Sequence, residues 1–108
     1  MKGDRLYLLH IAECIRKIQS YTGGRESFFG DQKTQDAVLR NLQTMAESTQ
    51  RLSDEFKARH PFTEWRKIAG FRNVLVHDYL GINLERVWEV VDRDLPILLT
   101  KVERALEE

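Results

Sequence analysis

Arg72 and His77 are the two side chains of this sequence best suited to chemistry on a phosphodiester. Arginine keeps its charge under ordinary conditions and presents a planar fork of donors that matches a phosphate. Histidine gives and takes a proton near neutral pH. Asn73 and Tyr79 stand in the same short segment, and the tyrosine adds a phenol that could be modified. These residue types together suggest cleavage of a phosphodiester.

The spacing of Arg72 and His77 does not by itself make a catalytic pair. On a regular helix they would lie about 140° apart around the axis and about 7.5 Å apart along it. Three arrangements could still bring them to one substrate: the arginine side chain bends round, the helix ends between the two residues, or a second copy of the chain completes the site. Gly70 shares the face of Asn73 and His77, and its lack of a side chain would let another backbone or a substrate come close.

An ordinary structural role is also open for both residues. Arg72 could cap the helix or pair with Asp78 or another nearby carboxylate, and a single helical histidine is more often a surface or half-buried residue than a catalyst.

Length and charge limit the range of functions. A chain of 108 residues fits a single domain over 1–108 with one modest core. It has 17 basic and 17 acidic side chains, so it lacks the positive field of a general nucleic-acid coat or a polybasic membrane binder. An RNA site must therefore be a local patch, and we do not expect a DNA partner.

The cysteine and the histidines argue against a disulfide framework and a structural metal. Cys14 is the single cysteine, which fits a reducing cytoplasm, and its place in a helical pattern predicts a small core residue. His10, His60 and His77 lack the spacing of zinc ligands, so we expect no metal and no cofactor. No apolar run is long enough to span a membrane, and the first residues lack a signal-peptide core, so we expect a cytoplasmic protein.

The elements that would carry these residues are all helical, because no segment alternates apolar and polar residues between turns. We expect long helices at the following places: after Asp4 to Gly23, from Lys33 to Leu52, from Thr63 to Leu80, and after Asn83 through Ala105, with a short helical turn over Ser53–Ala58. The segment 25–31 is expected to be a loop whose Phe28 and Phe29 fold back onto the core or onto a partner, with core packing preferred.

Local signals predict where these helices begin and end. The predicted N-caps are Asp4, Asp31, Thr63 and Asn83. Gly81 is expected to adopt the left-handed conformation after the helix that carries Arg72. Pro96 should bend or break the last helix, since proline removes one backbone hydrogen bond.

Taken in order, several motifs resemble the HepT-like members of the HEPN superfamily. Nearly the whole chain takes part, and the matching stretches are Asp31 to Leu42, Trp65 to Asn73, His77-Asp78-Tyr79, Gly81 to Leu84, Val87-Trp88 and Asp94-Leu95-Pro96. One step departs from the family: Ala46-Glu47-Ser48 stands where a Gly-Glu-Ala step is common, which puts the close packing allowed by glycine in question.

The resemblance implies an all-α HEPN-type bundle of four to five helices that forms a homodimer. It implies the toxin component of a type VII toxin–antitoxin pair, a metal-independent endoribonuclease whose partner is a cognate minimal nucleotidyltransferase antitoxin. In that scheme His77 moves the proton of the ribose 2′-OH or of the leaving 5′-oxygen, Arg72 stabilises the phosphate charge, and Asn73 orients the imidazole or the phosphate. Tyr79 matches the tyrosine that some members have adenylylated.

The competing interpretation is a helical binding module without catalysis, which docks to a nucleotidyltransferase or binds a nucleotide. The dimer has independent support in the sequence. Apolar residues surround the segment 63–80 on more sides than one bundle face can cover; they are Ile68, Phe71, Val74, Leu75 and Val76.

Overall fold

Helices account for most of the chain in the computed structural model, which describes residues 2–61 and 63–108. The elements are α1 (Lys2–Tyr21), α2 (Arg25–Gly30), α3 (Gln32–Arg51), α4 (Asp54–Arg59), α5 (Trp65–His77), the 3-10 turn η1 (Tyr79–Gly81), α6 (Leu84–Glu89), the π-helical turn η2 (Val90–Asp94) and α7 (Leu95–Leu106). No strand occurs within the described ranges. The predicted all-α fold is confirmed. In these same ranges, no helix has the length and apolar character that crossing a membrane would require.

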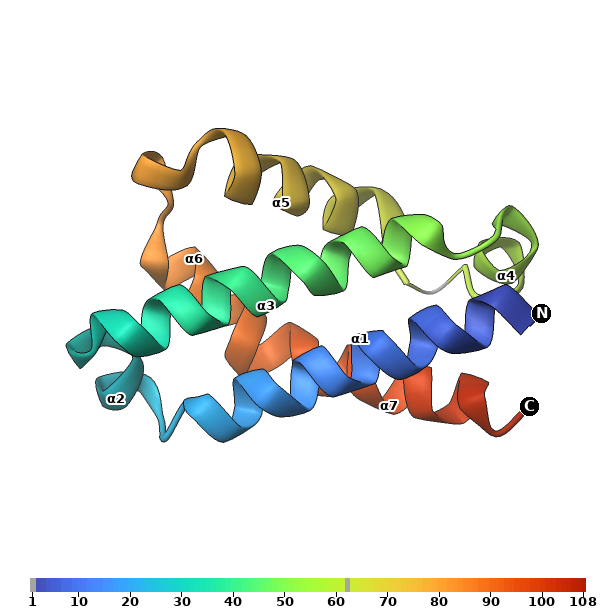
Figure 1. Ribbon diagram of the computed structural model, residues 1–108, viewed down its shortest axis with the longest axis horizontal. Helices are drawn as coiled ribbons and strands as arrows, with labels where there is room; N and C mark the ends of the chain where they lie inside the picture. The colour runs from blue at the N-terminus through green and yellow to red at the C-terminus, as the bar shows by residue number, and fades with distance from the viewer. Residues whose placement is uncertain (1, 62) are drawn as a thin grey trace.

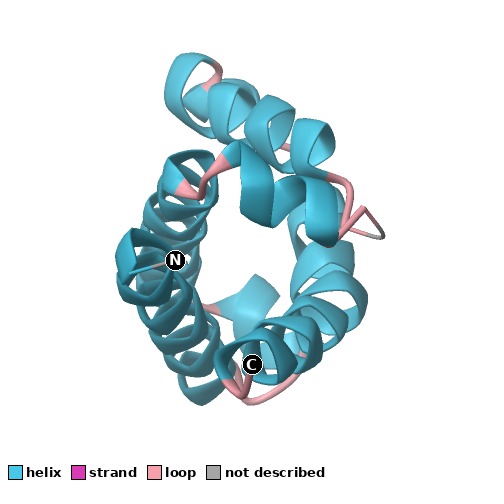
Figure 2. Cartoon of the chain, turned by 90° about the vertical axis from the view of Figure 1, so that its right-hand side faces the viewer, coloured by secondary structure: helices cyan, strands magenta, loops and turns pink. Residues whose placement is uncertain are grey.

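The long helices form a bundle in which α3 lies between α1 and α5, and α7 lies along α1 (Figure 1). An end-on view keeps α5 at the edge of the bundle (Figure 2). Apolar side chains at steps of three and four on α1, α3 and α7 meet in the middle. The fully buried ones include Ile11, Ile15, Ile18, Val38, Leu42 and Leu95. Helix α5 lies outside this core and packs mainly against α3.

Asp4 is not a helix cap, contrary to expectation, because α1 already begins at Lys2. Asp4 is only 5% exposed, and its carboxylate accepts hydrogen bonds from the backbone N–H and the hydroxyl of Ser53, both 2.7 Å long. Ser53 in turn caps α4, its hydroxyl oxygen accepting from the N–H of Phe56 at 3.1 Å. Burial opposes the charge of Asp4, but the hydrogen bonds from Ser53 outweigh it and hold the pKa of Asp4 below its ordinary value.

The segment 25–31, expected to be a loop, forms the short helix α2 over most of its length. Phe28 is fully buried, as predicted, with its ring centroid 5.2 Å from that of Phe29 and 5.6 Å from that of Trp88. Packing of these rings stabilises a helical turn that is too short to form alone. Gly24 precedes it with φ of 137°, a conformation that other residues rarely adopt.

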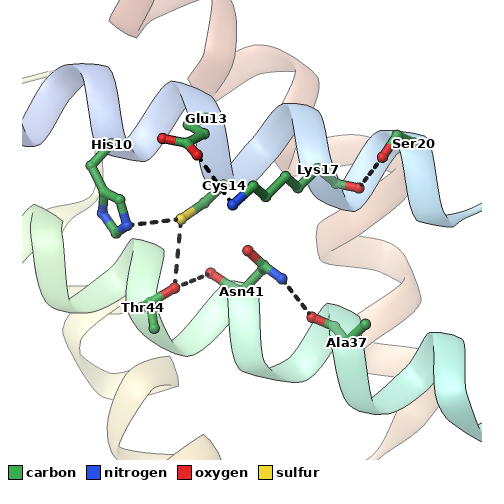
Figure 3. Close-up of polar contacts among 8 residues, drawn as sticks. All are labelled: His10, Glu13, Cys14, Lys17, Ser20, Ala37, Asn41 and Thr44. Atoms are coloured by element: carbon green, nitrogen blue, oxygen red, sulfur yellow. Dashed lines mark hydrogen bonds and ion pairs between the residues drawn. The ribbon is translucent and has the colours of Figure 1, made fainter.

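Polar side chains line part of the contact between α1 and α3 (Figure 3). The Cys14 sulfur lies 3.5 Å from both Nε2 of His10 and the hydroxyl of Thr44. Cys14 is buried, as predicted, and burial raises the pKa of its thiol. The other ring nitrogen of His10, Nδ1, is 2.6 Å from the hydroxyl of Ser48. Ser48 is buried, and His10 therefore partners its hydroxyl.

The helix that carries the motif is shorter than predicted at both ends. Thr63 is not its cap, because α5 begins at Trp65 after Glu64, which makes no capping bond through its side chain. It ends at His77 rather than at Leu80. Gly81 does not take a left-handed conformation; instead, a Cβ built there would lie 2.5 Å from Oδ1 of Asp78. The glycine leaves room for that carboxylate.

The caps of α3 and α6 are as predicted. Asp31 accepts from the N–H of Lys33 at 3.0 Å, and Asn83 accepts from the N–H groups of Glu85 and Arg86 at 2.9 and 3.2 Å.

Pro96 does not break the last helix, because the helical path continues from α6 through η2 into α7. The disturbance takes the form of the π-helical turn immediately before it, in which the N–H of Leu95 bonds to the carbonyl of Val90. A wider turn at this place accommodates a residue that cannot donate to the preceding turn.

Candidate functional site

Helix α5 brings Arg72, Asn73 and His77 to the edge of the bundle. Leu75 is its buried anchor, and Ile68 and Phe71 pack partly against the core. The remaining face of α5 is open to solvent. The site residues therefore stand on a rigid element with little cover above them.

Arg72 is held by two neighbours. Its Nη2 donates to Oε2 of Glu47 on α3 at 3.0 Å, and its Nη1 donates to Oδ1 of Asn73 at 3.3 Å. The Arg72 side chain is 27% exposed and that of Glu47 is 38% exposed. The Nε of Arg72 is buried and has no hydrogen-bond partner among the described residues. The guanidinium is thus half-buried against α3.

His77 is the last residue of α5 and is exposed. Because Arg72 and His77 lie on the same helix, the idea that the helix ends between them is wrong. Their ideal separation of about 140° around the axis therefore applies. The Arg72 side chain is bonded to Glu47 and Asn73 rather than to His77. A single chain does not join the two residues into one hydrogen-bonded pair.

Asn73 lies with Arg72 rather than with His77, since its carboxamide oxygen accepts from the guanidinium. Sequence reasoning placed it on the face of His77 because helical phase gives only the direction of the Cα–Cβ bond. The side chain turns toward the stronger donor beside it, and a charged donor makes the stronger hydrogen bond.

Tyr79 lies in η1, beyond the end of α5. If the helix had continued to Leu80, as the sequence predicted, helical repeat would have placed Tyr79 on the face of Arg72; the end of α5 at His77 makes that placement wrong. Tyr79 is 52% exposed, and its hydroxyl donates to Oδ1 of Asp36 on α3 at 3.1 Å. This hydrogen bond to a carboxylate raises the pKa of Tyr79 above its ordinary value. A hollow of about 190 Å³ beside it is also lined by Arg40 and Leu75.

A larger groove of about 440 Å³ runs between α5 and the α6–η2–α7 segment. Apolar residues such as Ile68 and Leu98 line it together with charged residues such as Lys67 and Asp94. Neither Arg72 nor His77 lines it. If the functional site were chosen by groove volume alone, it would exclude Arg72 and His77, whose chemistry is best suited to a phosphodiester. Within residues 2–61 and 63–108, no three His, Cys, Asp or Glu side chains gather in a way that could hold a metal ion.

Sequence reasoning missed the two acidic partners from α3. In the sequence, Glu47 stands out only as part of the Ala46-Glu47-Ser48 step, and Asp36 lies within the 31–42 stretch without a role of its own. They lie 25 and 43 residues away from Arg72 and Tyr79, so no local spacing pairs them. The one sequence signal that could have suggested these two partners is that each is a carboxylate on the outward side of α3.

Comparison with known proteins adds an independent observation. Residues 11–105 match the family model described as ribonuclease HepT-like. A probable ribonuclease HepT of Thermococcus cleftensis is 38% identical over 105 residues, which cover 95% of this chain and 96% of that protein. The mRNA nuclease HepT of Shewanella oneidensis is 31% identical over 109 residues, covering 79% of this chain and 82% of the relative.

A third relative is longer than this chain. It comes from Methanocaldococcus jannaschii, and its name combines a gamma-glutamylcyclotransferase with a candidate RNase. It is 34% identical over 109 residues, which are 99% of this chain and 49% of that protein. This chain therefore spans about half of that relative. No solved structure matches the chain. The family match over most of the sequence, together with the all-helical bundle, shows that the chain belongs to the HepT-like family of the HEPN superfamily.

Proposed function

We propose that this chain is an endoribonuclease and the toxin of a toxin–antitoxin pair, with Arg72 and His77 as its catalytic residues. The observation that carries the proposal is their placement on α5: a half-buried, anchored arginine and an exposed histidine on one rigid helix. Relatives named as HepT ribonucleases support the substrate class. An anchored cation and an exposed proton carrier are the two groups that phosphodiester cleavage by an internal hydroxyl needs.

In the proposed reaction, His77 takes the proton of a ribose 2′-OH as that oxygen attacks the adjacent phosphorus. The bond from phosphorus to the 5′-oxygen breaks, the protonated His77 returns its proton to that leaving oxygen, and a 2′,3′-cyclic phosphate remains. Arg72 stabilises the negative charge on the phosphate oxygens in the transition state. This scheme needs the 2′-OH, which restricts it to RNA. It uses no metal.

A second copy of the chain would complete the site. Arg72 and His77 diverge on one helix, so a substrate phosphate reaches both more easily where two α5 helices meet. Two apolar side chains beside the motif support such an interface: Val74 is 45% exposed and Leu80 is 99% exposed. Burying these two side chains against a second copy of the chain would favour association.

Control of the toxin is proposed to act at Tyr79, through adenylylation by a cognate minimal nucleotidyltransferase. The phenol is exposed, so a partner enzyme can reach it. Attached AMP would bring roughly one negative charge and a bulky base close to the end of α5. Both effects would oppose the binding of RNA at His77.

The central test is cleavage of RNA by Arg72→Ala and His77→Ala proteins in the presence of a chelator. Each should lose cleavage by about 100-fold or more, because each removes a separate role at the phosphate. Circular dichroism should show that both remain helical. Full cleavage by a folded His77→Ala protein would refute the assignment, and loss of wild-type activity with chelator would point to a metal-dependent mechanism.

Mixing the two inactive variants tests the shared site. If Arg72 of one copy works with His77 of the other, the mixture should regain part of the activity, since some dimers then hold one intact pair. Light scattering should report a dimer at micromolar concentration. A folded wild-type protein that binds a nucleotidyltransferase and cleaves no RNA would favour the non-catalytic binding module instead.

A further inference from the structure

The ion pair between Arg72 and Glu47 differs from the other inter-helix arginine–glutamate pairs of the described chain. Its two side chains are 27% and 38% exposed, whereas those of Arg16 and Glu103 are 56% and 49% exposed. Solvent screens it less, so it restrains its partners more strongly than a surface pair does. It also connects α5 to α3, the helix that supports it.

The contacts of Arg72 leave part of its guanidinium available. A guanidinium has five N–H donors, one on Nε and two on each terminal nitrogen. Glu47 takes one from Nη2, and Asn73 takes one from Nη1. Each terminal nitrogen keeps a second N–H that a phosphate oxygen can accept from. The carboxylate thus fixes the plane of the group without using all of its donors.

We propose that Glu47 is a positioning residue, which holds the Arg72 guanidinium in the orientation that receives the scissile phosphate. The inference rests on the proposed function, in which Arg72 contacts that phosphate. A free arginine side chain would lose many rotamers on binding RNA, and an arginine fixed in advance loses few. Asn73, the next residue on α5, assists because its carboxamide oxygen accepts a hydrogen bond from Nη1, the other terminal nitrogen of Arg72.

The test measures single-turnover cleavage of RNA by Glu47 variants. Glu47→Ala should slow the cleavage step by about 10- to 100-fold, because the guanidinium is no longer held in place. Glu47→Gln should keep most of the rate, since its amide oxygen can still accept from Nη2. Glu103→Ala removes another inter-helix pair of 3.0 Å and should cleave like the wild type.

A double variant separates positioning from a general structural role. In an Arg72→Ala background, Glu47→Ala should cause no further loss, because Glu47 acts through the arginine. An equal loss in both backgrounds would overturn the inference. So would Glu47→Ala cleavage at or above the wild-type rate, which would make Glu47 a counter-ion that weakens RNA binding. Full cleavage by Arg72→Ala itself would instead refute the proposed function.

A measurement without substrate keeps the inference testable on its own. In an NMR spectrum, the buried Nε–H of Arg72 should exchange slowly with water, and Arg72→Lys should remove its signal. Glu47→Ala should speed this exchange by about tenfold or more, while Glu103→Ala should leave it unchanged. An Arg72 signal that is the same in the Glu47→Ala protein would show that Glu47 does not hold the side chain.

Discussion

Replacing Asp4 by alanine should destabilise the whole bundle, although Asp4 lies far from Arg72 and His77 in the chain. Its buried carboxylate accepts two 2.7 Å hydrogen bonds from Ser53, one from the backbone and one from the hydroxyl. Hydrogen bonds to a charged group contribute about 1.5–3 kcal/mol each, and Ser53 is partly accessible to water, so we expect a loss of about 3 kcal/mol. For a domain of this size that corresponds to a fall in Tm of roughly 12 °C or more.

Thermal and urea unfolding, followed by circular dichroism, measure this loss. Asp4→Asn keeps one acceptor oxygen and should lose about half as much. Asp92→Asn, at an exposed position in η2, is the matched control and should unfold like the wild type. A Tm for Asp4→Ala within about 3 °C of the wild type would refute the reasoning, because the hydrogen bonds to Ser53 would then contribute little.

The same carboxylate gives a dependence on pH with a defined sign. The pKa of Asp4 is lower in the folded protein than its ordinary value of 3.8, so its charge stabilises the fold above that pH. The contribution is lost as the pH falls through the lower folded pKa. The stability difference between wild type and Asp4→Asn should therefore be constant near neutral pH and narrow below 3.8. A difference that widens on acidification would show that the carboxyl group is protonated in the folded state.

Three further substitutions test the turns and the proposed control. Gly24→Ala should lower the free energy of unfolding by about 1–3 kcal/mol, because φ is 137° at that position. Gly81→Ala should lower it by less than about 1 kcal/mol, since the exposed Asp78 carboxylate can move away from the added Cβ. Equal losses in urea unfolding would contradict this difference. Incubation with the cognate nucleotidyltransferase and ATP should add AMP to a Tyr79 peptide by mass spectrometry, and Tyr79→Phe should escape; a label elsewhere would refute that site.

Local signals predicted the features that depend on residues close together in the chain. Apolar residues at steps of three and four line the core faces of α1, α3 and α7, and this spacing can be read from the sequence because a helix turns once in 3.6 residues. The caps Asp31 and Asn83 were also predictable, since each side chain reaches a backbone N–H only two or three residues away. The helical location of Arg72 and His77 followed from the same periodicity.

Local signals failed where a tertiary contact competed with them. Asp4 has the residue type of a cap, yet it bonds to Ser53, which lies 49 residues away. The segment of α2 has the composition of a loop, but the burial of Phe28 against Trp88 makes it helical. In both cases a distant partner supplies more free energy than the local preference does.

The sequence by itself determined the helical class of this protein, most of its core and the residues whose chemistry suits a phosphodiester, because residue type and helical spacing are properties of neighbouring positions. Only the tertiary structure decided that α5 ends at His77 rather than at Leu80, that Glu47 holds Arg72, and that Asp36 partners Tyr79. Those pairings join positions 25 and 43 residues apart. Such contacts exist only after α3 and α5 have packed against each other, and no local pattern contains that information.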